Sequence, residues 1–181
     1  MSTKIISVDP GVSKDPRLSG AICLMNLKGE VEELFPVPHK KYPMSKKGKT
    51  KVKVNMLELS NKLKSLRLTD ESFIVIEEVT AMPGQGVTSM FSFGETFGTI
   101  KGLLYKYSKY TDLNTIRPQK WKKHFKLGSD KEKVIEECKR LYPNVCLKAS
   151  ARAKKDSSGM AEAVLLGKYF LDCELKKHGI I

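Results

Sequence analysis

The sequence predicts an α/β fold: a mixed five-stranded sheet, made of an antiparallel meander plus parallel strands, flanked by helices. Three strand-like segments follow one another within the first 37 residues, which suits antiparallel pairing because parallel neighbours need long crossover connections. After residue 50, segments with helical spacing of apolar residues alternate with short apolar strands, as in helices packed on a sheet. We expect one domain over residues 1–181, because a chain of this length can build a single core.

The meander is predicted from strands at 4–9, 18–26 and 30–37. Lys28-Gly29 suits a hairpin turn between the last two of these strands. The segment that follows, 38–51, is rich in lysine, contains proline and glycine, and has almost no apolar residues. We therefore expect a basic flexible loop there, within the domain.

Two further strands and five helices are expected in the rest of the chain. The strands are placed at 72–79 and 112–117, and the helices at 52–68, 87–107, 118–125, 130–142 and 158–177. In the helix at 87–107, Gly94, Gly98 and Gly102 recur every four residues. A glycine inside a helix costs about 1 kcal/mol relative to alanine, so this row suits a face where another surface packs very closely. That surface is either the sheet or a dimer mate.

The charge balance indicates a polyanionic partner, most often nucleic acid. Lysine and arginine total 33 against 20 acidic residues, which gives a net charge of +13. Lysines cluster between Lys40 and Lys53, and smaller basic groups follow near residues 120–126 and 152–155. The alternative is a highly soluble surface that has no such partner.

Membrane and disulfide-dependent classes are not favoured. The apolar runs are shorter than a membrane span, and the first residues do not form a signal peptide. The four cysteines are scattered without a CxxC pair, which argues against a zinc ribbon or a disulfide framework and fits a reducing compartment. We expect a cytoplasmic protein without a membrane partner.

Two acids lie at the ends of apolar strands, Asp9 after the first and Glu77 in the strand at 72–79. Side chains alternate along a strand, so only one of Glu77 and Glu78 can point into a given site, and we favour Glu77. A charge in such a place is costly unless it is paired or holds a cation. The alternatives are that Asp9 only forms a turn and that both glutamates are solvated.

A second pair of acids, Asp156 and Glu162, lies at the start of the final helix. If the first and fourth strands are neighbours, Asp9 and Glu77 converge, and a helix end packed over them adds Glu162 and Asp156. Carboxylates gathered in this way repel one another unless divalent cations bind, and oxygen ligands without a Cys/His cluster suit Mg²⁺ or Mn²⁺. In a basic protein such a site suggests two-metal phosphodiester hydrolysis. Alternatively, Asp156 is a loop acid or helix cap and Glu162 an exposed first-turn acid.

Several stretches of the chain resemble the RuvC-type Holliday-junction resolvases, in the form found in bacteriophage members. They are the Ser-Val-Asp-Pro-Gly of 7–11 with the Ser-Gly-Ala-Ile of 19–22, the strand 74–79 with 81–94, and the segments 118–123 and 159–163. The resemblance covers nearly the whole chain, and the Met-Pro-Gly-Gln-Gly block at 82–86 is its most specific part. It implies a ribonuclease H-like fold, a homodimer, Mg²⁺ dependence and symmetric cutting of four-way DNA junctions, in the host cytoplasm if the chain is phage-encoded.

Carried over residue by residue, Asp9 matches the first-strand aspartate of that family, Glu77 the fourth-strand glutamate and Glu162 an acid of the last helix. Many phage relatives have an aspartate directly before the helix glycine, where this chain has Ser158. Asp156 lies two residues earlier and shares no helix face with Glu162 unless it sits in the preceding loop. Either Asp156 substitutes from the loop, or the site has three carboxylates and weaker metal binding, or the chain is a disabled variant.

The expected functions differ in substrate and in chemistry. The leading hypothesis is a Mg²⁺-dependent junction-resolving endonuclease; the rivals are a broader nuclease for flaps, forks or RNA–DNA hybrids, and a junction-binding protein with little catalysis. DNA contacts are expected from basic residues and from one aromatic wedge: Lys46, Lys47, Lys49, Lys51, Lys122, Lys123, Arg152, Lys154, Lys155 and Phe91. The alternatives are a solvated basic loop and a Phe91 that packs in the core. Trp121 is left open between a place along the sheet and a DNA contact.

Overall fold

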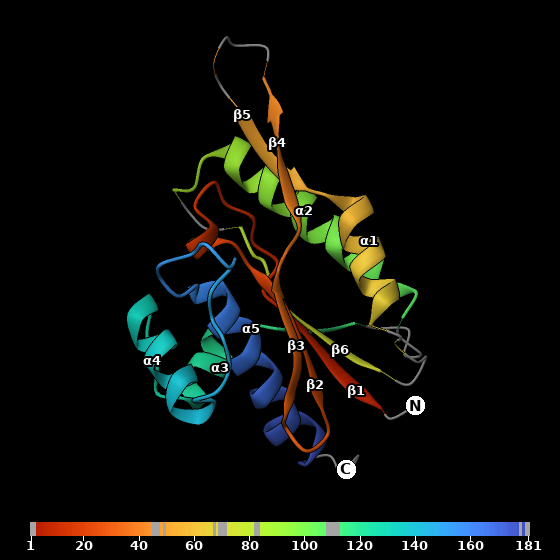
Figure 1. Cartoon of the computed structure of the whole chain (residues 1–181), viewed down its shortest axis with the longest axis vertical. Helices are drawn as coiled ribbons and strands as arrows, with labels where there is room; N and C mark the ends of the chain where they lie inside the picture. The colour runs from red at the N-terminus through yellow and green to blue at the C-terminus, as the bar shows by residue number, and fades with distance from the viewer. Residues whose placement is uncertain are drawn as a thin grey trace.

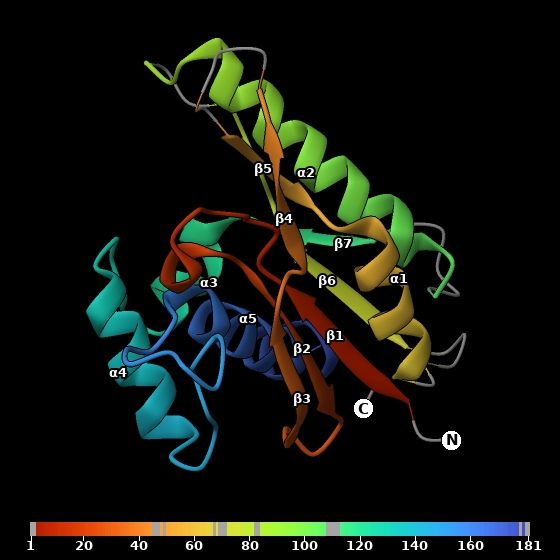
Figure 2. The ribbon, with the colours of Figure 1, turned by 45° about the horizontal axis from the view of Figure 1, so that its top comes forward.

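A mixed five-stranded sheet forms the centre of the computed structural model, which describes residues 3–44, 48, 50–66, 68, 72–81, 84–107, 113–177 and 179. The strand order is β3-β2-β1-β6-β7. β1 (Lys4–Val8), β2 (Ala21–Asn26) and β3 (Val31–Pro36) pair antiparallel, whereas β6 (Phe73–Glu77) pairs parallel with β1, and β7 (Asn114–Ile116) pairs parallel with β6 (Figure 2). The predicted fold class is confirmed, with the first strand central and next to the fourth strand of the sheet in sequence order.

Helices cover both faces of this sheet (Figure 1). One face packs against α5 (Ser158–Tyr169), which continues into a π-helical segment, Phe170–Leu175. The other face packs against α1 (Met56–Ser65) and α2 (Val87–Tyr105). The alternation of strand side chains explains the two cores: Ile5 of β1 belongs to the α5 side and Ile6 to the opposite side.

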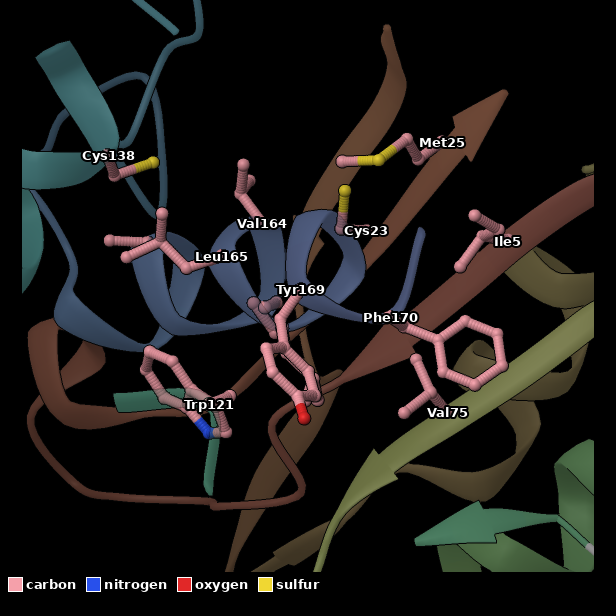
Figure 3. Packing of buried hydrophobic residues seen from close by; sticks show 14 of the residues in the cluster. Ile5, Cys23, Met25, Val75, Trp121, Cys138, Val164, Leu165, Tyr169 and Phe170 are labelled. Carbon is pink, nitrogen blue, oxygen red and sulfur yellow. The ribbon is translucent and has the colours of Figure 1, made fainter. Parts of the chain in front are cut away.

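The α5 side carries the larger core cluster (Figure 3). α3 (Pro118–His124) and α4 (Lys131–Leu141) flank α5 there, and Trp121 and Cys138 contribute fully buried side chains. In Figure 3, Val164, Leu165 and Tyr169 project from α5 into this cluster. Within the described part of the chain, no helix has both the length and the apolar character that a membrane crossing requires.

The basic segment 38–51 differs from the expected loop. Its described residues form most of a hairpin, in which β4 (His39–Pro43) and β5 (Thr50–Val54) pair antiparallel and project from the body of the protein beside α2 (Figures 1 and 2). The backbone pairs fully from His39↔Val54 to Pro43↔Thr50, and Glu95 of α2 binds two β5 lysines, Lys51 and Lys53. These ion pairs with a distant helix, together with the β-branched Thr50, Val52 and Val54, favour the strands. The lysine-rich composition of the segment had indicated a loop instead.

Helix boundaries differ from the expectation at two places. The helix expected from residue 52 begins at Met56, because Asn55 caps it by accepting a hydrogen bond from the Glu58 backbone N–H. The last helix is α-helical only to Tyr169 and then widens to a π-helix. The other predicted elements are found within a few residues of their expected ends.

The glycine row of α2 does not pack on the sheet. The helix buries Thr96, Ile100 and Leu104, whereas a Cβ added to Gly94, Gly98 or Gly102 would meet nothing within 4 Å. Of the two surfaces considered for this row, the sheet is therefore excluded. The glycines line an open face of the helix.

Candidate active site

Asp9 and Glu77 lie side by side at one end of two parallel strands. β1 and β6 are neighbours in a register that pairs Val8 with Ile76, and each acid is the residue that follows. The carboxyl ends of parallel strands meet at the same edge of a sheet, so this register places the two acids together. The condition stated for the convergence of Asp9 and Glu77, that their strands are neighbours, is thereby met.

Close backbone packing fixes the position of Asp9. Its backbone N–H donates to the Ala21 carbonyl (3.0 Å), and its Oδ1 accepts from the Gly11 N–H (3.3 Å). A Cβ on Gly20 would lie 2.1 Å from the Asp9 carbonyl oxygen, so only glycine allows the chain to pass this close. The half-buried Asp9 side chain is thus held at a tight crossing of two backbone segments.

Helix α5 rests directly on the same region and brings in Glu162. A Cβ on Gly159 would lie 2.1 Å from the Ser19 carbonyl oxygen, and the Ser7 hydroxyl of β1 donates to the Ala163 carbonyl at 2.6 Å. Ser157 caps the helix by accepting from the Met160 N–H (3.4 Å). Glu162 is only 3% exposed, so it is not the solvated first-turn acid considered as an alternative.

The three carboxylates lie within one another's electrostatic field. Burial raises the pKa of Asp9 well above its ordinary value, and the charges of Glu162 and Glu77 raise it further. Burial and then the charge of Glu162 also raise the pKa of Glu77. This mutual repulsion is the property that a bound divalent cation would relieve.

Two lysines oppose this negative charge. Lys122 of α3 and Lys131 of α4 both bind Glu162, at 2.9 Å and 2.8 Å, and Lys131 contacts both carboxylate oxygens. Burial lowers the pKa of Lys131, but the nearby carboxylates, Glu162 foremost, outweigh this effect and raise it overall. The Lys131 ammonium thus partly offsets the negative charge of the three acids.

The two neighbouring glutamates of β6 have different partners. Glu77 accepts a hydrogen bond at Oε2 from the indole Nε1 of Trp121, at 2.8 Å. Glu78 forms an ion pair with Arg117 (3.2 Å), whose side chain is 71% exposed. Glu77 is therefore the acid that interacts with Asp9 and Glu162, in keeping with the strand alternation.

Asp156 and Ser158 have partners other than the three carboxylates. Asp156 forms an ion pair with Lys139 of α4 at 2.5 Å. Buried Ser158 donates through its hydroxyl to the Arg17 carbonyl, at 3.4 Å. Among the described residues, no hydrogen bond or ion pair links Asp156 to Asp9, Glu77 or Glu162. The geometry accords with the three-carboxylate alternative.

Carboxylate oxygens are the ligands that a hard divalent cation prefers, so the three acids suit such an ion chemically. In this structure, however, Glu162 is bound to two lysines. Across the described ranges, no group of three or more His, Cys, Asp and Glu side chains has the geometry to hold a metal ion. The oxygens of Glu162 face ammonium groups instead. Asp9 and Glu77 would hold Mg²⁺ or Mn²⁺, and Glu162 would join them by exchanging a lysine for the cation.

The residues expected to contact DNA fall into three groups: exposed residues, residues bound to an acid, and residues outside the described part of the chain. Lys123, Arg152, Lys154 and Lys155 are exposed, and Phe91 is 73% exposed on α2, which argues against its place in the core. Lys122 binds Glu162 and Lys51 binds Glu95 (3.3 Å). Lys46, Lys47 and Lys49 lie outside the described residues, as do Met82 and Pro83 of the resemblance block.

A basic cavity of about 570 Å³ opens next to the carboxylates. Its cationic lining comes from Arg17, Lys131, Lys139, Lys154 and Lys155, which belong to a 3₁₀ helix (Pro16–Leu18), α4 and the loop before α5. Lys131 lines this cavity and also binds Glu162, so it connects the cavity wall to the carboxylate group.

The sequence did not predict the role of Lys131, and it left the place of Trp121 open. One signal for Lys131 was present: a cation in the first turn of α4 opposes the helix macrodipole, and such a local conflict often marks a functional position. No comparable signal pointed to the Trp121–Glu77 contact. It joins two elements that are 44 residues apart in the sequence.

Comparisons with known proteins give matches in structure only. No protein-family model matches the chain, and neither does the sequence of any curated protein. RuvC of Thermus thermophilus in complex with a Holliday junction substrate aligns with 98% of this chain and 97% of its own, at 11% identity and a TM-score of 0.49. A second Thermus thermophilus RuvC structure aligns over the same shares at 12% identity and a TM-score of 0.47.

Proposed function

We propose that this chain is a divalent-metal-dependent endonuclease that resolves four-way DNA junctions by phosphodiester hydrolysis. The observation that carries the proposal is the convergence of Asp9, Glu77 and Glu162 from the beginning, middle and end of the chain. Their mutual repulsion calls for cations, and the protein around them has a net charge of +13, which suits a polyanionic substrate.

In this proposal the acids of the site bind the cations and the basic residues bind the phosphate groups. Asp9, Glu77 and Glu162 would hold two Mg²⁺ or Mn²⁺ ions, which act as Lewis acids on the phosphodiester and on water. Lys122 and Lys131, released from Glu162 as it turns to the cations, would donate to phosphate oxygens and offset the charge that builds there. Arg17, Lys154 and Lys155 would hold the adjoining strand through its backbone.

The four-way junction as substrate rests on the motif resemblance and on the exposed aromatic ring of α2. Phe91 lies in the second turn of α2, a few residues after Gly84 and Gly86, and its ring is exposed to solvent. An exposed ring at such a place can insert between bases. The bacteriophage branch remains part of the same proposal, since the Met-Pro-Gly-Gln-Gly block carries it.

A homodimer is proposed because a junction presents two strands to be cut. The open face of α2 runs through Phe91, Gly94, Gly98, Gly102 and Tyr105, at spacings of three, four, four and three residues. Phe91 and Tyr105 are exposed, and the glycines between them leave room for a second helix to approach closely. A second copy of α2 fits this surface, with large side chains at both ends and a smooth centre.

One observation favours a second candidate, a junction-binding protein with weak cleavage. Ser158 stands where many relatives in the resembled branch carry an aspartate, and Asp156 is bound to Lys139 instead of joining the site. A site with three carboxylates and two lysines holds cations less tightly than one with four carboxylates. Binding would then persist while catalysis falls.

The decisive experiment compares binding and cleavage by the same protein. A synthetic four-way junction, a flap and an RNA–DNA hybrid are incubated at equal concentration with Mg²⁺ or Mn²⁺, using wild type, Asp9→Asn and the control Glu78→Gln. We expect the junction to be cut fastest by wild type and Glu78→Gln, and to be bound but not cut by Asp9→Asn. Equal cleavage by wild type and Asp9→Asn would eliminate the site; salt-sensitive binding without products would favour the second candidate.

A further inference from the structure

Trp121 is the only tryptophan of the chain, and its ring belongs to the core on the α5 side. It is fully buried, in α3, and Figure 3 shows it at the margin of the labelled cluster, near Leu165 and Tyr169. Its indole N–H leaves this apolar surrounding and donates to Oε2 of Glu77 at 2.8 Å. The ring is therefore anchored in the core while its polar edge reaches a carboxylate of the candidate active site.

This hydrogen bond orients Glu77 without neutralising it. Glu162 is bound by two ammonium groups, which offset its charge. The indole is neutral and has one proton to donate, so its hydrogen bond brings no opposing charge to Glu77. In the described part of the chain, the side chain of Glu77 makes no other hydrogen bond, and its Oε1 stays free to bind a cation.

The rigidity of the donor matters because the acceptor is flexible. A glutamate side chain has three rotatable bonds, whereas the Trp121 ring is held on all sides by packed side chains. Outer hydrogen-bond partners of this kind fix the orientation of metal ligands, and their loss commonly lowers metal affinity 10- to 100-fold. The bond also favours the charged carboxylate, against the effects of burial and of Glu162.

We propose that Trp121 is a positioning residue: it holds Glu77 with one oxygen turned to the divalent cation, and its emission reports whether that cation is bound. The inference rests on the proposed function in one respect, the presence of a cation between Asp9 and Glu77. It does not depend on which nucleic acid is cut. The competing explanation is that Glu77 merely satisfies a buried indole N–H, which would make the bond a matter of stability alone.

The test uses Mn²⁺ as the probe and needs no substrate. Mn²⁺ binding is measured by electron paramagnetic resonance of the free ion for wild type, Trp121→Phe, Glu77→Gln and the double variant. Phenylalanine keeps an aromatic ring in the core and removes the N–H donor. Thermal denaturation in EDTA records how far each variant is destabilised without metal, and quenching of Trp121 emission by Mn²⁺ is followed in wild type and Glu77→Gln.

We expect Trp121→Phe to weaken Mn²⁺ binding 10- to 100-fold and to have almost no further effect in the Glu77→Gln background. We also expect Mn²⁺ to quench wild-type emission over the concentration range in which it binds. Unchanged affinity in Trp121→Phe, or an equal loss in both backgrounds, would overturn the inference. If Trp121→Phe does not fold, the wild-type emission decides: bound Mn²⁺ without quenching overturns the inference.

These outcomes separate the inference from the proposed function. Wild type that binds Mn²⁺ with the expected pattern but cuts no junction would leave the role of Trp121 standing and remove the proposed function. Wild type that cuts junctions while Trp121→Phe binds Mn²⁺ normally would do the opposite. Absence of Mn²⁺ binding by wild type would overturn both.

Discussion

Replacing Lys131 by methionine should destabilise the metal-free protein and leave the metal-bound protein less affected. Lys131 donates to both oxygens of Glu162 at 2.8 Å, and the Glu162 side chain is 4% exposed. Methionine keeps most of the length of the side chain and removes its charge. The remaining partner, Lys122, must then balance a group of three acids alone.

The size of the effect follows from the two environments. A hydrogen bond to a charged group contributes about 1.5–3 kcal/mol when it is protected from water, and an exposed ion pair about 0–1 kcal/mol. Lys131 is 47% exposed and Glu162 is buried, so we expect a loss of about 1–2 kcal/mol. For a chain of this size this corresponds to a fall in Tm of about 2–8 °C.

Divalent cations should reduce this difference. The ammonium of Lys131 and a cation are attracted by the same carboxylates, so Lys131→Met is expected to bind Mg²⁺ more tightly than wild type. A tenfold gain in affinity adds about 1.4 kcal/mol of stabilisation once the cation is in excess, which offsets the loss. Thermal denaturation in EDTA and in Mg²⁺, at fixed protein concentration, measures both quantities.

Lys133→Met is the matched control, because Lys133 lies in the same helix and is exposed. We expect it to change Tm little in either condition. If Lys131→Met lowers Tm equally with and without Mg²⁺, Lys131 does not compete with a cation. If it lowers Tm no more than the control does, the ion pair contributes nothing to stability, and the reasoning is refuted.

Other predictions follow from the acids, the hairpin and the open helix face. Asp9→Asn should raise the unfolding free energy of the metal-free protein at neutral pH by about 1 kcal/mol, measured by urea denaturation in EDTA; a loss would contradict the buried repulsion. Metal-free wild type should lose stability as pH rises from the ordinary carboxyl range through the raised pKa values of Asp9 and Glu77, because the folded state retains protons that the unfolded state releases. A flat or rising Tm over that window would refute this sign. Glu95→Gln should free two hairpin lysines and steepen the salt dependence of junction binding, by up to about 0.9 per lysine in log–log slope; an unchanged slope counts against hairpin contacts. Gly98→Leu should leave the monomer folded, since nothing lies within 4 Å of the added Cβ, and should dissociate the proposed dimer in analytical ultracentrifugation; an unaltered dimer would place the interface elsewhere.

The sheet and the paired acids were predictable because local patterns determine them. Alternating or continuous apolar residues located the strands, and an acid at the end of each of two strands indicated where Asp9 and Glu77 meet. The hairpin was not predictable, because the lysine-rich composition of its strands is typical of a loop. Their contacts with Glu95, more than 40 residues away, leave no sign in the local sequence. Contacts between distant segments leave no periodic signal in a sequence.

The same limit applies to the partners of the acids. Position in the chain indicated Glu162, but only packing of α3 and α4 against α5 shows that Lys122 and Lys131 bind it. The departure at Ser158 left three alternatives open, and the structure adds that Asp156 forms an ion pair with Lys139. Loop acids are hard to assign from sequence, because short changes in loop path decide which cation they reach.

The hydrogen bond between Ser7 and Ala163 joins residues 156 positions apart, and Ser7 lies two residues before Asp9 while Ala163 directly follows Glu162. During synthesis β1 is made first and α5 near the end, so α5 can pack on β1 only after nearly the whole domain has been made. Such distant closures are slow and come late in folding. A partly synthesised or truncated chain would lack Glu162 while already carrying most of its lysines, so it would have much of the positive charge of the protein without the complete group of acids.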